Sequence, residues 1–312
     1  MTTRSPTSPG RLARVLTLMA LLALPCAGCG GRGAGTATLR AHDTHVWTVP
    51  PDGTRQPAVR SLAVGARNEV YALDTAGRVL VYAATGTLLR RWSMPDVSVG
   101  KPEGVTVLRD GHVVVSDTHY HRVVEFDATG GVVRIFGREG KGPGEFIYPV
   151  AVTVDPRENL YVAEYGSNDR VQVFTRDGVF VRTFGAFGTG PGDFQRPSGL
   201  VWHDGSVYVA DAFNNRIVVY SDQGRFLRVL ETTALNFPYD LKLDAGGALL
   251  VIEYGAGRLT RMTRDGRLLG RFGATGSALG QFSTPWGLVI DHRGRVLVAD
   301  AGNRRIVELM LE

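Results

Sequence analysis

The sequence predicts an all-β fold made of six similar units. Each unit contains two apolar runs that flank a short loop, and an acidic residue closes the first run. Consecutive acids are 42 to 47 residues apart, a period typical of the four-stranded blades of a propeller. Turn pairs such as Asp177-Gly178 and Asp265-Gly266 lie between alternating apolar runs and indicate tight hairpins. We therefore predict a six-bladed β-propeller, whose closing acids are Asp74, Asp117, Glu164, Asp211, Glu253 and Asp300.

One unit shows the predicted order of the strands. Residues 102–108 form its first strand, which starts at a proline. Residues 112–116, 122–126 and 132–136 form the second, third and fourth strands, with turns rich in Asp and Gly between them. No stretch of the repeats keeps a helical period, so we expect strands and turns throughout.

The two ends of the repeat region predict how the ring closes. The last unit stops at Glu312 after three strands, and one extra strand, residues 45–49, precedes the first unit. We expect this N-terminal strand to complete the last blade, because closure protects a long β topology from fraying at its ends. The propeller would then occupy residues 42–312.

The repeats resemble a known family. The run Asp211-Ala-Phe-Asn-Asn-Arg-Ile217, the segment Pro197-Ser-Gly-Leu200 and the linker at residues 184–194 are similar to NHL repeats. The pattern recurs at least four times in register between about residue 100 and residue 312, whereas the copy at residues 60–95 lacks the Asn-x-Arg element. The resemblance implies a six-bladed NHL-type propeller.

The N-terminal residues resemble an export signal. Residues 1–28 contain three arginines followed by an apolar run at 15–24, which is too short to span a bilayer comfortably. Ala27-Gly28-Cys29 resembles the end of a bacterial lipoprotein signal, which implies a lipidated Cys29 as the first mature residue. The protein would then be a membrane-anchored lipoprotein of the bacterial cell envelope, on its periplasmic or surface face. Residues 29–41 would form a flexible tether. Secretion without lipid and a retained membrane anchor are the alternatives.

Export changes the meaning of the overall charge. The full chain has a formal charge of +5, but residues 1–28 contain three arginines and no acid. Without them, 32 basic side chains face 30 acidic ones, and the formal charge falls to +2. We therefore predict no nucleic-acid partner. Both cysteines lie within residues 26–29, so the repeats can form no disulfide.

A basic residue accompanies each closing acid. An arginine follows the acid after four to six residues in every unit. The pairs could form a ring of ligand contacts, but a feature present in every blade at nearly one offset is typical of a requirement of the fold. We predict structural ion pairs. The arginines are Arg78, Arg122, Arg170, Arg216, Arg258 and Arg305.

The candidate binding face lies where loops meet around the central channel. In a propeller the loops between second and third strands share one face with the connections between blades, and such loops commonly hold binding sites. Aromatic and mixed polar side chains gather there, which suits a protein, peptide or glycan ligand. Glu103, Tyr148 and Arg196 also lie where first strands begin. The predicted binding residues are His119, Tyr120, His121, Tyr165, Asn168, Phe213, Asn214, Tyr239, Asp240, Tyr254 and Trp286.

His119 and His121 have the spacing of a pair of metal ligands. We expect no third histidine near them, because the other histidines of the repeats lie at the opposite ends of the strands. A metal would need an acid such as Glu103 or Glu164 as a further ligand. We therefore predict loop histidines, with no metal, no cofactor and no catalytic residue.

The alternative function is a metal-dependent lyase or hydrolase with its site at the mouth of the channel. Peptide-amidating lyases have repeats similar to these, with metal-binding histidines just after the proline that starts the first strand. This chain has no histidine at those positions, which argues against transferring the lyase site. The positions hold Glu103, Val150, Ser198, Tyr239 and Trp286. We predict a non-enzymatic binding or scaffold module that is tethered to a membrane by its lipid.

Overall fold

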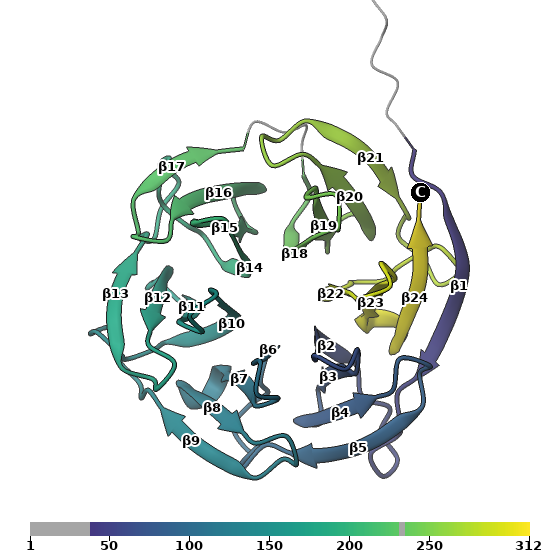
Figure 1. Ribbon diagram of the computed structural model, residues 1–312, viewed down its shortest axis with the longest axis horizontal. Coiled ribbons are helices and arrows are strands. Elements are labelled where there is room, and N and C mark those ends of the chain that lie inside the picture. Colours follow the sequence, from purple (N-terminus) through teal and green to yellow (C-terminus); the bar gives the residue numbers. More distant parts are fainter. Residues whose placement is uncertain (1–37, 231–234) are drawn as a thin grey trace, which may run out of the picture. The chain divides into compact units, whose positions relative to one another are not determined.

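The structure is a computed structural model that describes residues 38–230 and 235–312, and Asp43 only in its backbone. These residues form six antiparallel sheets of four strands each, arranged as a ring around a central channel (Figure 1). The predicted six-bladed β-propeller is thereby confirmed. The predicted signal at residues 1–28 and Cys29 lie outside the described residues. Within those described, no helix is long and apolar enough to cross a membrane.

The first three blades follow the order of the chain from the channel to the rim. Blade 1 consists of β2 (Val59–Val64), β3 (Val70–Asp74), β4 (Arg78–Tyr82) and β5 (Leu88–Ser93). Blade 2 consists of β6 (Gly104–Val107), β7 (Val113–Asp117), β8 (Arg122–Phe126) and β9 (Val132–Phe136). Blade 3 consists of β10 (Tyr148–Val154), β11 (Leu160–Tyr165), β12 (Arg170–Phe174) and β13 (Phe180–Phe184).

The remaining blades keep this order except at the last rim strand. Blade 4 consists of β14 (Pro197–His203), β15 (Ser206–Asp211), β16 (Arg216–Ser221) and β17 (Phe226–Val229). Blade 5 consists of β18 (Pro238–Leu243), β19 (Leu249–Glu253), β20 (Arg258–Met262) and β21 (Leu268–Phe272). Blade 6 consists of β22 (Gly287–Ile290), β23 (Val296–Asp300), β24 (Arg305–Leu311) and β1 (Ala41–Thr48). Two single-turn 3-10 helices follow β7 and β23, at Thr118–Tyr120 and Ala301–Asn303.

The N-terminal strand closes the ring as predicted. β1 pairs antiparallel with β24, from Ala41 opposite Leu311 to Thr48 opposite Arg305. Trp47 of β1 is 5% exposed, and its ring centroid lies 5.6 Å from that of Tyr82 in blade 1. The first and last parts of the described chain are thus joined in one sheet that packs on the neighbouring blade.

The core is distributed around the ring. The described residues form six apolar clusters, one between each pair of neighbouring blades. The alternating apolar residues of the two middle strands supply most of each cluster, because both faces of a blade are covered by its neighbours. Three linkers between blades each add one fully buried phenylalanine: Phe146, Phe194 and Phe282.

The inner strands approach one another so closely that glycine is needed. A Cβ on Gly104 would lie 2.5 Å from the carbonyl oxygen of Val150, and one on Gly199 would lie 2.8 Å from that of Tyr239. In β2, β10, β14 and β18 the pairing with the second strand shifts register at one residue, which is Arg60, Val150, Ser198 and Tyr239, respectively. Such a bulge re-aims a side chain, and at this position the side chain lines the central channel.

Each blade contains the predicted acid–arginine pair. All six closing acids are fully buried, and each accepts a hydrogen bond or ion pair from its arginine at 2.7–2.8 Å. The arginine also bonds to the linker that enters the blade in most units. Arg170 donates to the carbonyl oxygens of Gly142 (2.9 Å) and Glu145 (3.0 Å), and Arg305 donates to that of Gln281 (3.0 Å). These pairs serve the fold, because they join a loop to a linker in the protein interior.

The closure of the ring can be tested at Trp47. We expect Trp47→Ala to lower the free energy of unfolding by about 3–5 kcal/mol, because it leaves a cavity between blades 6 and 1. It also removes the indole N–H that donates to Glu308 (2.8 Å). Val46→Ala is the matched control, since Val46 is adjacent and 46% exposed. Urea unfolding of both variants gives the measurement, and equal midpoints would contradict the closure role of β1.

Candidate binding site at the channel mouth

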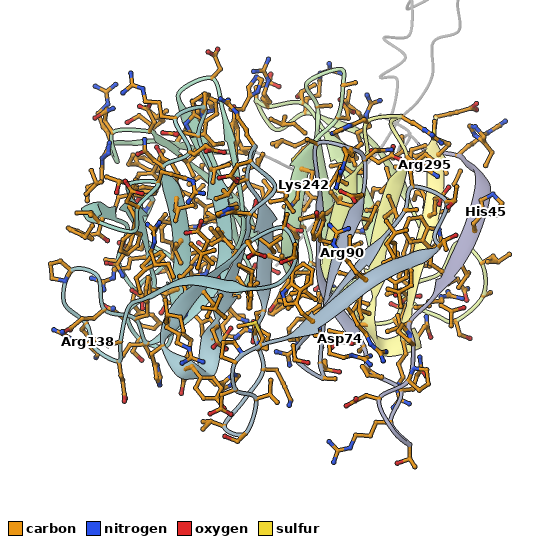
Figure 2. All side chains as sticks on the ribbon, turned by 60° about the horizontal axis from the view of Figure 1, so that its bottom comes forward. His45, Asp74, Arg90, Arg138, Lys242 and Arg295 are labelled. Carbon is orange, nitrogen blue, oxygen red and sulfur yellow. The ribbon has the colours of Figure 1, made fainter. Side chains whose placement is uncertain are left out.

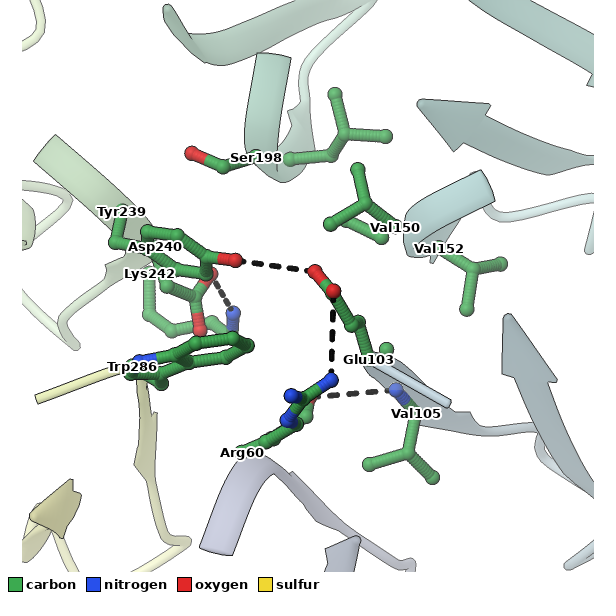
Figure 3. Close-up of a pocket in the computed structure, with 14 residues that line it drawn as sticks. Arg60, Glu103, Val105, Val150, Val152, Ser198, Tyr239, Asp240, Lys242 and Trp286 are labelled. Atoms are coloured by element: carbon green, nitrogen blue, oxygen red, sulfur yellow. Dashed lines mark hydrogen bonds and ion pairs between the residues drawn. The ribbon is translucent and has the colours of Figure 1, made fainter. Parts of the chain in front are cut away.

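One residue from each blade lines the mouth of the central channel. We call these six the ring residues. In blades 1, 3, 4 and 5 the ring residue directly follows the residue that pairs with the closing acid. In blades 2 and 6 it directly precedes the inner strand. Figure 3 shows that they come from all six inner strands or the linkers just before them. The ring residues are Arg60, Glu103, Val150, Ser198, Tyr239 and Trp286.

Glu103 is the electrostatic centre of the mouth. Its side chain is only 4% exposed, and its carboxylate accepts a hydrogen bond from the hydroxyl of Tyr239 at 3.1 Å. The Arg60 guanidinium lies 3.4 Å from one carboxylate oxygen, and that of Arg196 lies 3.7 Å from the other. Arg196 also donates to the Tyr239 hydroxyl at 3.1 Å. Two guanidinium groups therefore share the Glu103 carboxylate, and these three groups together carry a net charge of +1. The buried Asp169 accepts the backbone N–H of Arg196 at 2.6 Å.

Both guanidinium groups rest on aromatic rings. Arg60 lies 4.3 Å from the ring centroid of Trp286, and Arg196 lies 4.1 Å from that of Tyr165. Attraction to the π-face of a ring helps to hold a cation whose charge is incompletely paired. Each arginine side chain is 18% exposed, so part of it remains accessible from the mouth. The site thus presents two fixed cations within an aromatic frame.

An aromatic shelf extends from the ring across blades 4, 5 and 6. The ring centroid of Tyr239 lies 5.0 Å from that of Trp286 and 6.0 Å from that of Tyr254. Phe237 contacts Tyr254 at 5.1 Å and Phe213 at 5.3 Å. Phe213 is 58% exposed, which makes it the outer end of the shelf. The shelf offers apolar contact area next to the two arginines.

Charged side chains line the channel below the mouth. Asp240 accepts hydrogen bonds from Lys242 Nζ (2.7 Å) and from the backbone N–H of Leu288 (3.2 Å), so a second ion pair fills the interior. The cavity encloses about 380 Å³ of atom-free space, part of it open to solvent. Because this ion pair occupies space below the mouth, the candidate ligand contacts are those at the mouth.

Burial sets the protonation of the mouth. Burial raises the pKa of Tyr239 well above 10, and the Glu103 carboxylate acts in the same direction. Burial likewise raises the pKa of Tyr165. The pKa of Arg196 is raised, because its interactions with Tyr239, Glu103 and Tyr165 outweigh the opposing effect of burial. At neutral pH the Tyr239 hydroxyl is a donor and the Arg196 guanidinium is fully charged.

The structure brings together about half of the sequence-predicted binding residues. Tyr165, Phe213, Tyr239, Asp240, Tyr254 and Trp286 line the mouth, the shelf or the channel. Asn168 and Asn214 have another task, because their amides donate to the buried acids Glu164 (3.3 Å) and Asp211 (2.8 Å).

His119, Tyr120 and His121 bond mainly to linkers. The Nδ1 atom of His119 lies 3.2 Å from the carbonyl oxygen of Lys101, and the Tyr120 hydroxyl accepts the N–H of Val99 at 2.8 Å. The Nδ1 atom of His121 is hydrogen-bonded to the carbonyl oxygen of Ile147. Within residues 38–230 and 235–312, no group of three or more His, Cys, Asp or Glu residues is arranged to hold a metal.

Arg60 and Phe237 are the residues that sequence reasoning missed. Arg60 lies in the first repeat, where no proline marks the start of the inner strand. A signal was nevertheless present, because Arg60 precedes Asp74 by 14 residues, as Glu103 precedes Asp117. Phe237 has no such signal, since its positive φ of 53° turns it toward the shelf from a linker of irregular sequence.

Comparisons with known proteins agree with this architecture. Residues 100–126 match the NHL repeat, and residues 157–239 match a family described as 6-bladed beta-propeller. The chain contains an NHL repeat in a six-bladed β-propeller. Protein brain tumor of Drosophila melanogaster is 27% identical over 176 residues, which cover 56% of this chain. Human NHL repeat-containing protein 3 is 30% identical over 121 residues, which cover 33% of it. The chain spans only 12% and 35% of these two relatives, respectively.

Solved structures with the same fold include enzymes. A gluconolactonase from Xanthomonas campestris aligns with a TM-score of 0.64 at 16% identity, over 90% of this chain and 99% of that protein. The virginiamycin B lyase from Staphylococcus aureus aligns with a TM-score of 0.60 at 14% identity, over 88% of this chain and 100% of that protein. Similarity at this level of identity shows the fold alone.

The hydrogen-bond centre of the mouth can be tested at Tyr239. We expect Tyr239→Phe to lower the free energy of unfolding by about 1–3 kcal/mol, because Glu103 and Arg196 lose the shared hydroxyl. Tyr254→Phe is the control, since its hydroxyl makes no hydrogen bond within the described residues. The measurement is urea unfolding at pH 7, where the control should lie within about 0.5 kcal/mol of the wild type.

The same pair of proteins gives a pH dependence. Above pH 10 the unfolded chain releases the Tyr239 proton, whereas the folded protein retains it. The free energy of unfolding of the wild type should therefore fall as pH rises above 10. For Tyr239→Phe, the slope of this free energy against pH should be shallower by an amount that corresponds to at most one proton. Parallel slopes for wild type and variant would contradict the raised pKa of Tyr239.

Proposed function

We propose that this protein is an exported, lipid-anchored binding module of the bacterial cell envelope. Its channel mouth would bind a peptide segment of a partner protein. The supporting observation is the mouth itself, where Arg60 and Arg196 share a single buried carboxylate beside an aromatic shelf. The lipid anchor is supported by the sequence pattern that ends at Cys29.

The chemistry of the mouth favours a ligand with a carboxylate and an apolar group. The surplus positive charge attracts a carboxylate, and a guanidinium fork can bind both of its oxygens. The shelf from Tyr239 to Phe213 lies next to these cations and can pack an apolar or aromatic side chain. An acidic side chain or a chain terminus next to a large apolar residue meets both requirements.

The ring offers little support for the enzymatic alternative. Ser198 is the hydroxyl-bearing nucleophile candidate among the six ring residues, and its Oγ donates to the carbonyl oxygens of Pro238 (3.3 Å) and Ala210 (3.5 Å). Activation of a serine requires an adjacent base, and these partners are backbone carbonyls. At 14% and 16% identity, the lyase and the lactonase share the fold with this chain and assign no reaction to it.

The peptide-binding proposal can be tested by selection. The intact protein is panned against a displayed random peptide library, and the selected peptides are measured with Arg60→Met/Arg196→Met. We expect peptides with an acidic group next to an aromatic or aliphatic residue, and a dissociation constant about tenfold or more weaker in the variant. Arg91→Met/Arg225→Met is the charge-matched control, because both residues are exposed away from the mouth. Equal loss in both variants, or arginine-dependent binding to a glycan array only, would overturn the proposal.

The anchor can be tested separately at Cys29. In the bacterial cell the wild type should partition into the detergent phase and have an acylated N-terminal cysteine by mass spectrometry. Cys29→Ser should carry no acyl group. An unmodified wild-type N-terminus would exclude lipidation as the means of anchoring, without affecting the peptide-binding proposal.

A further inference from the structure

The two faces of the ring differ in their loops. We call the face with the acid–arginine loops and the linkers the mouth face. The opposite turn face contains the turns between first and second strands and between third and fourth strands. Figure 2 separates the faces, with Asp74 and Arg138 on the lower side and Arg295 on the upper side. Features on the turn face are therefore remote from the proposed ligand site.

An open groove on the turn face between blades 4 and 5 is rich in arginine. Arg228, Arg261, Arg264 and Arg267 line it, together with apolar atoms of Tyr208 and Leu269. The groove encloses about 940 Å³ of atom-free space, including space open to solvent. We call these four residues the arginine groove.

The groove contains more positive than negative side chains. Arg261 is paired with Asp244 at 2.6 Å. Arg228, Arg264 and Arg267 are exposed and form no ion pair within the described part of the chain. The one acid that lines the groove, Asp265, has a lowered pKa because the Thr263 hydroxyl and backbone N–H groups bond to it and because the charge of Arg267 is near, so it stays charged. Four arginines thus face the two carboxylates of Asp244 and Asp265, and Arg228 also donates to the carbonyl oxygen of Arg264 (3.2 Å), which leaves the groove with a surplus of positive charge.

The arginine groove lies close to the place where the chain joins the ring. β1 starts at Ala41 opposite Leu311, the turn-face end of β24, and Leu39 donates its N–H to the carbonyl oxygen of Arg271 (2.9 Å). Arg271 belongs to β21, which begins just after Arg267. Arg261 lines both the arginine groove and the neighbouring groove that contains Leu311. In Figure 1, β21 and β1 follow one another along the rim, and β1 starts near the end of β21.

We propose that the arginine groove binds the anionic headgroups of the membrane that holds the anchor. This inference rests on the lipid anchor proposed at Cys29. Cys29 and Thr38 are nine residues apart, so even an extended chain spans at most about 30 Å and keeps this side of the ring near the surface. Clustered arginines bind anionic lipid surfaces, and they commonly provide the second signal beside a lipid chain. The turn face would rest on the membrane, and the mouth would face away from it.

The orientation can be measured with single-cysteine probes. The repeats contain no cysteine, so one can be introduced by Gln223→Cys on the turn face or by Leu279→Cys on the mouth face, both exposed. Each full-length mature lipoprotein is labelled with a fluorophore and reconstituted into vesicles that contain a headgroup-linked quencher. One set of vesicles is phosphatidylcholine alone, and the other also contains phosphatidylglycerol.

We expect the anionic vesicles to quench the Gln223→Cys probe and to leave the Leu279→Cys probe bright. High salt should reverse the quenching while the anchored protein stays on the vesicles, because salt screens exposed charges. When Arg264→Gln/Arg267→Gln is added to the Gln223→Cys protein, the quenching by anionic vesicles should fall to the level seen with vesicles of phosphatidylcholine alone. Arg109→Gln/Arg157→Gln, which removes the same charge from exposed arginines elsewhere on the turn face, should leave it intact.

Three outcomes would overturn the membrane contact. They are quenching that is independent of phosphatidylglycerol, equal quenching of both probes, and equal effects of both arginine pairs. Arginine-dependent binding to a soluble sulfated polysaccharide, without quenching on anionic vesicles, would also exclude it and would assign the groove to a polyanionic glycan. Dissociation of the protein from all vesicles at high salt would contradict the lipid anchor. It would leave the membrane contact of the arginine groove to be decided by the quenching at low salt.

Discussion

The rest of the propeller depends on the buried pair of an acid and an arginine in each blade. In blade 4, Asp211 accepts the Arg216 Nε–H at 2.7 Å and the backbone N–H of Gln195 at 2.6 Å. Arg216 in turn donates to the carbonyl oxygen of Asp193 at 2.8 Å. One pair therefore fixes a loop and the linker that leads to the ring residue Ser198. Burying two charges costs about as much as their attraction returns, so the pair contributes geometry more than net stability.

Blade 2 shows what happens when this arrangement is incomplete. Oδ1 of Asp117 is buried without a hydrogen-bond partner, and burial raises the pKa of this acid. The linker before blade 2 lacks the long Gly-rich sequence that precedes blades 3, 4 and 6, and His119 and Tyr120 bond to it instead, at Lys101 and Val99. This explains why the aromatic residues of that loop, which suggested ligand contacts from the sequence, serve to hold a linker. Blade 2 still places Glu103 among the ring residues.

The sequence predicted the fold more completely than the site. Six acids at a steady spacing determine the number of blades. One extra strand at the N-terminus and a last unit of only three strands determine the closure, because both follow from local pattern. The ring depends on contacts between blades. Arg60 and Arg196 come from opposite sides of the channel and meet only at Glu103, 43 and 93 residues away from it, respectively, in the sequence. The repeat pattern marks equivalent positions, but it does not reveal which side chains at those positions pair.

Strand direction alone places the two proposed contacts on opposite faces. The last strand of the chain, β24, runs from the mouth face to the turn face, and β1 must begin at the turn face because it pairs antiparallel with β24. A propeller closed in this way therefore receives its N-terminal segment on the side away from its mouth. An anchor at the N-terminus would leave the mouth open to large ligands, and basic residues such as Arg264 and Arg267 on the turn face would strengthen that orientation without contacting the ligand.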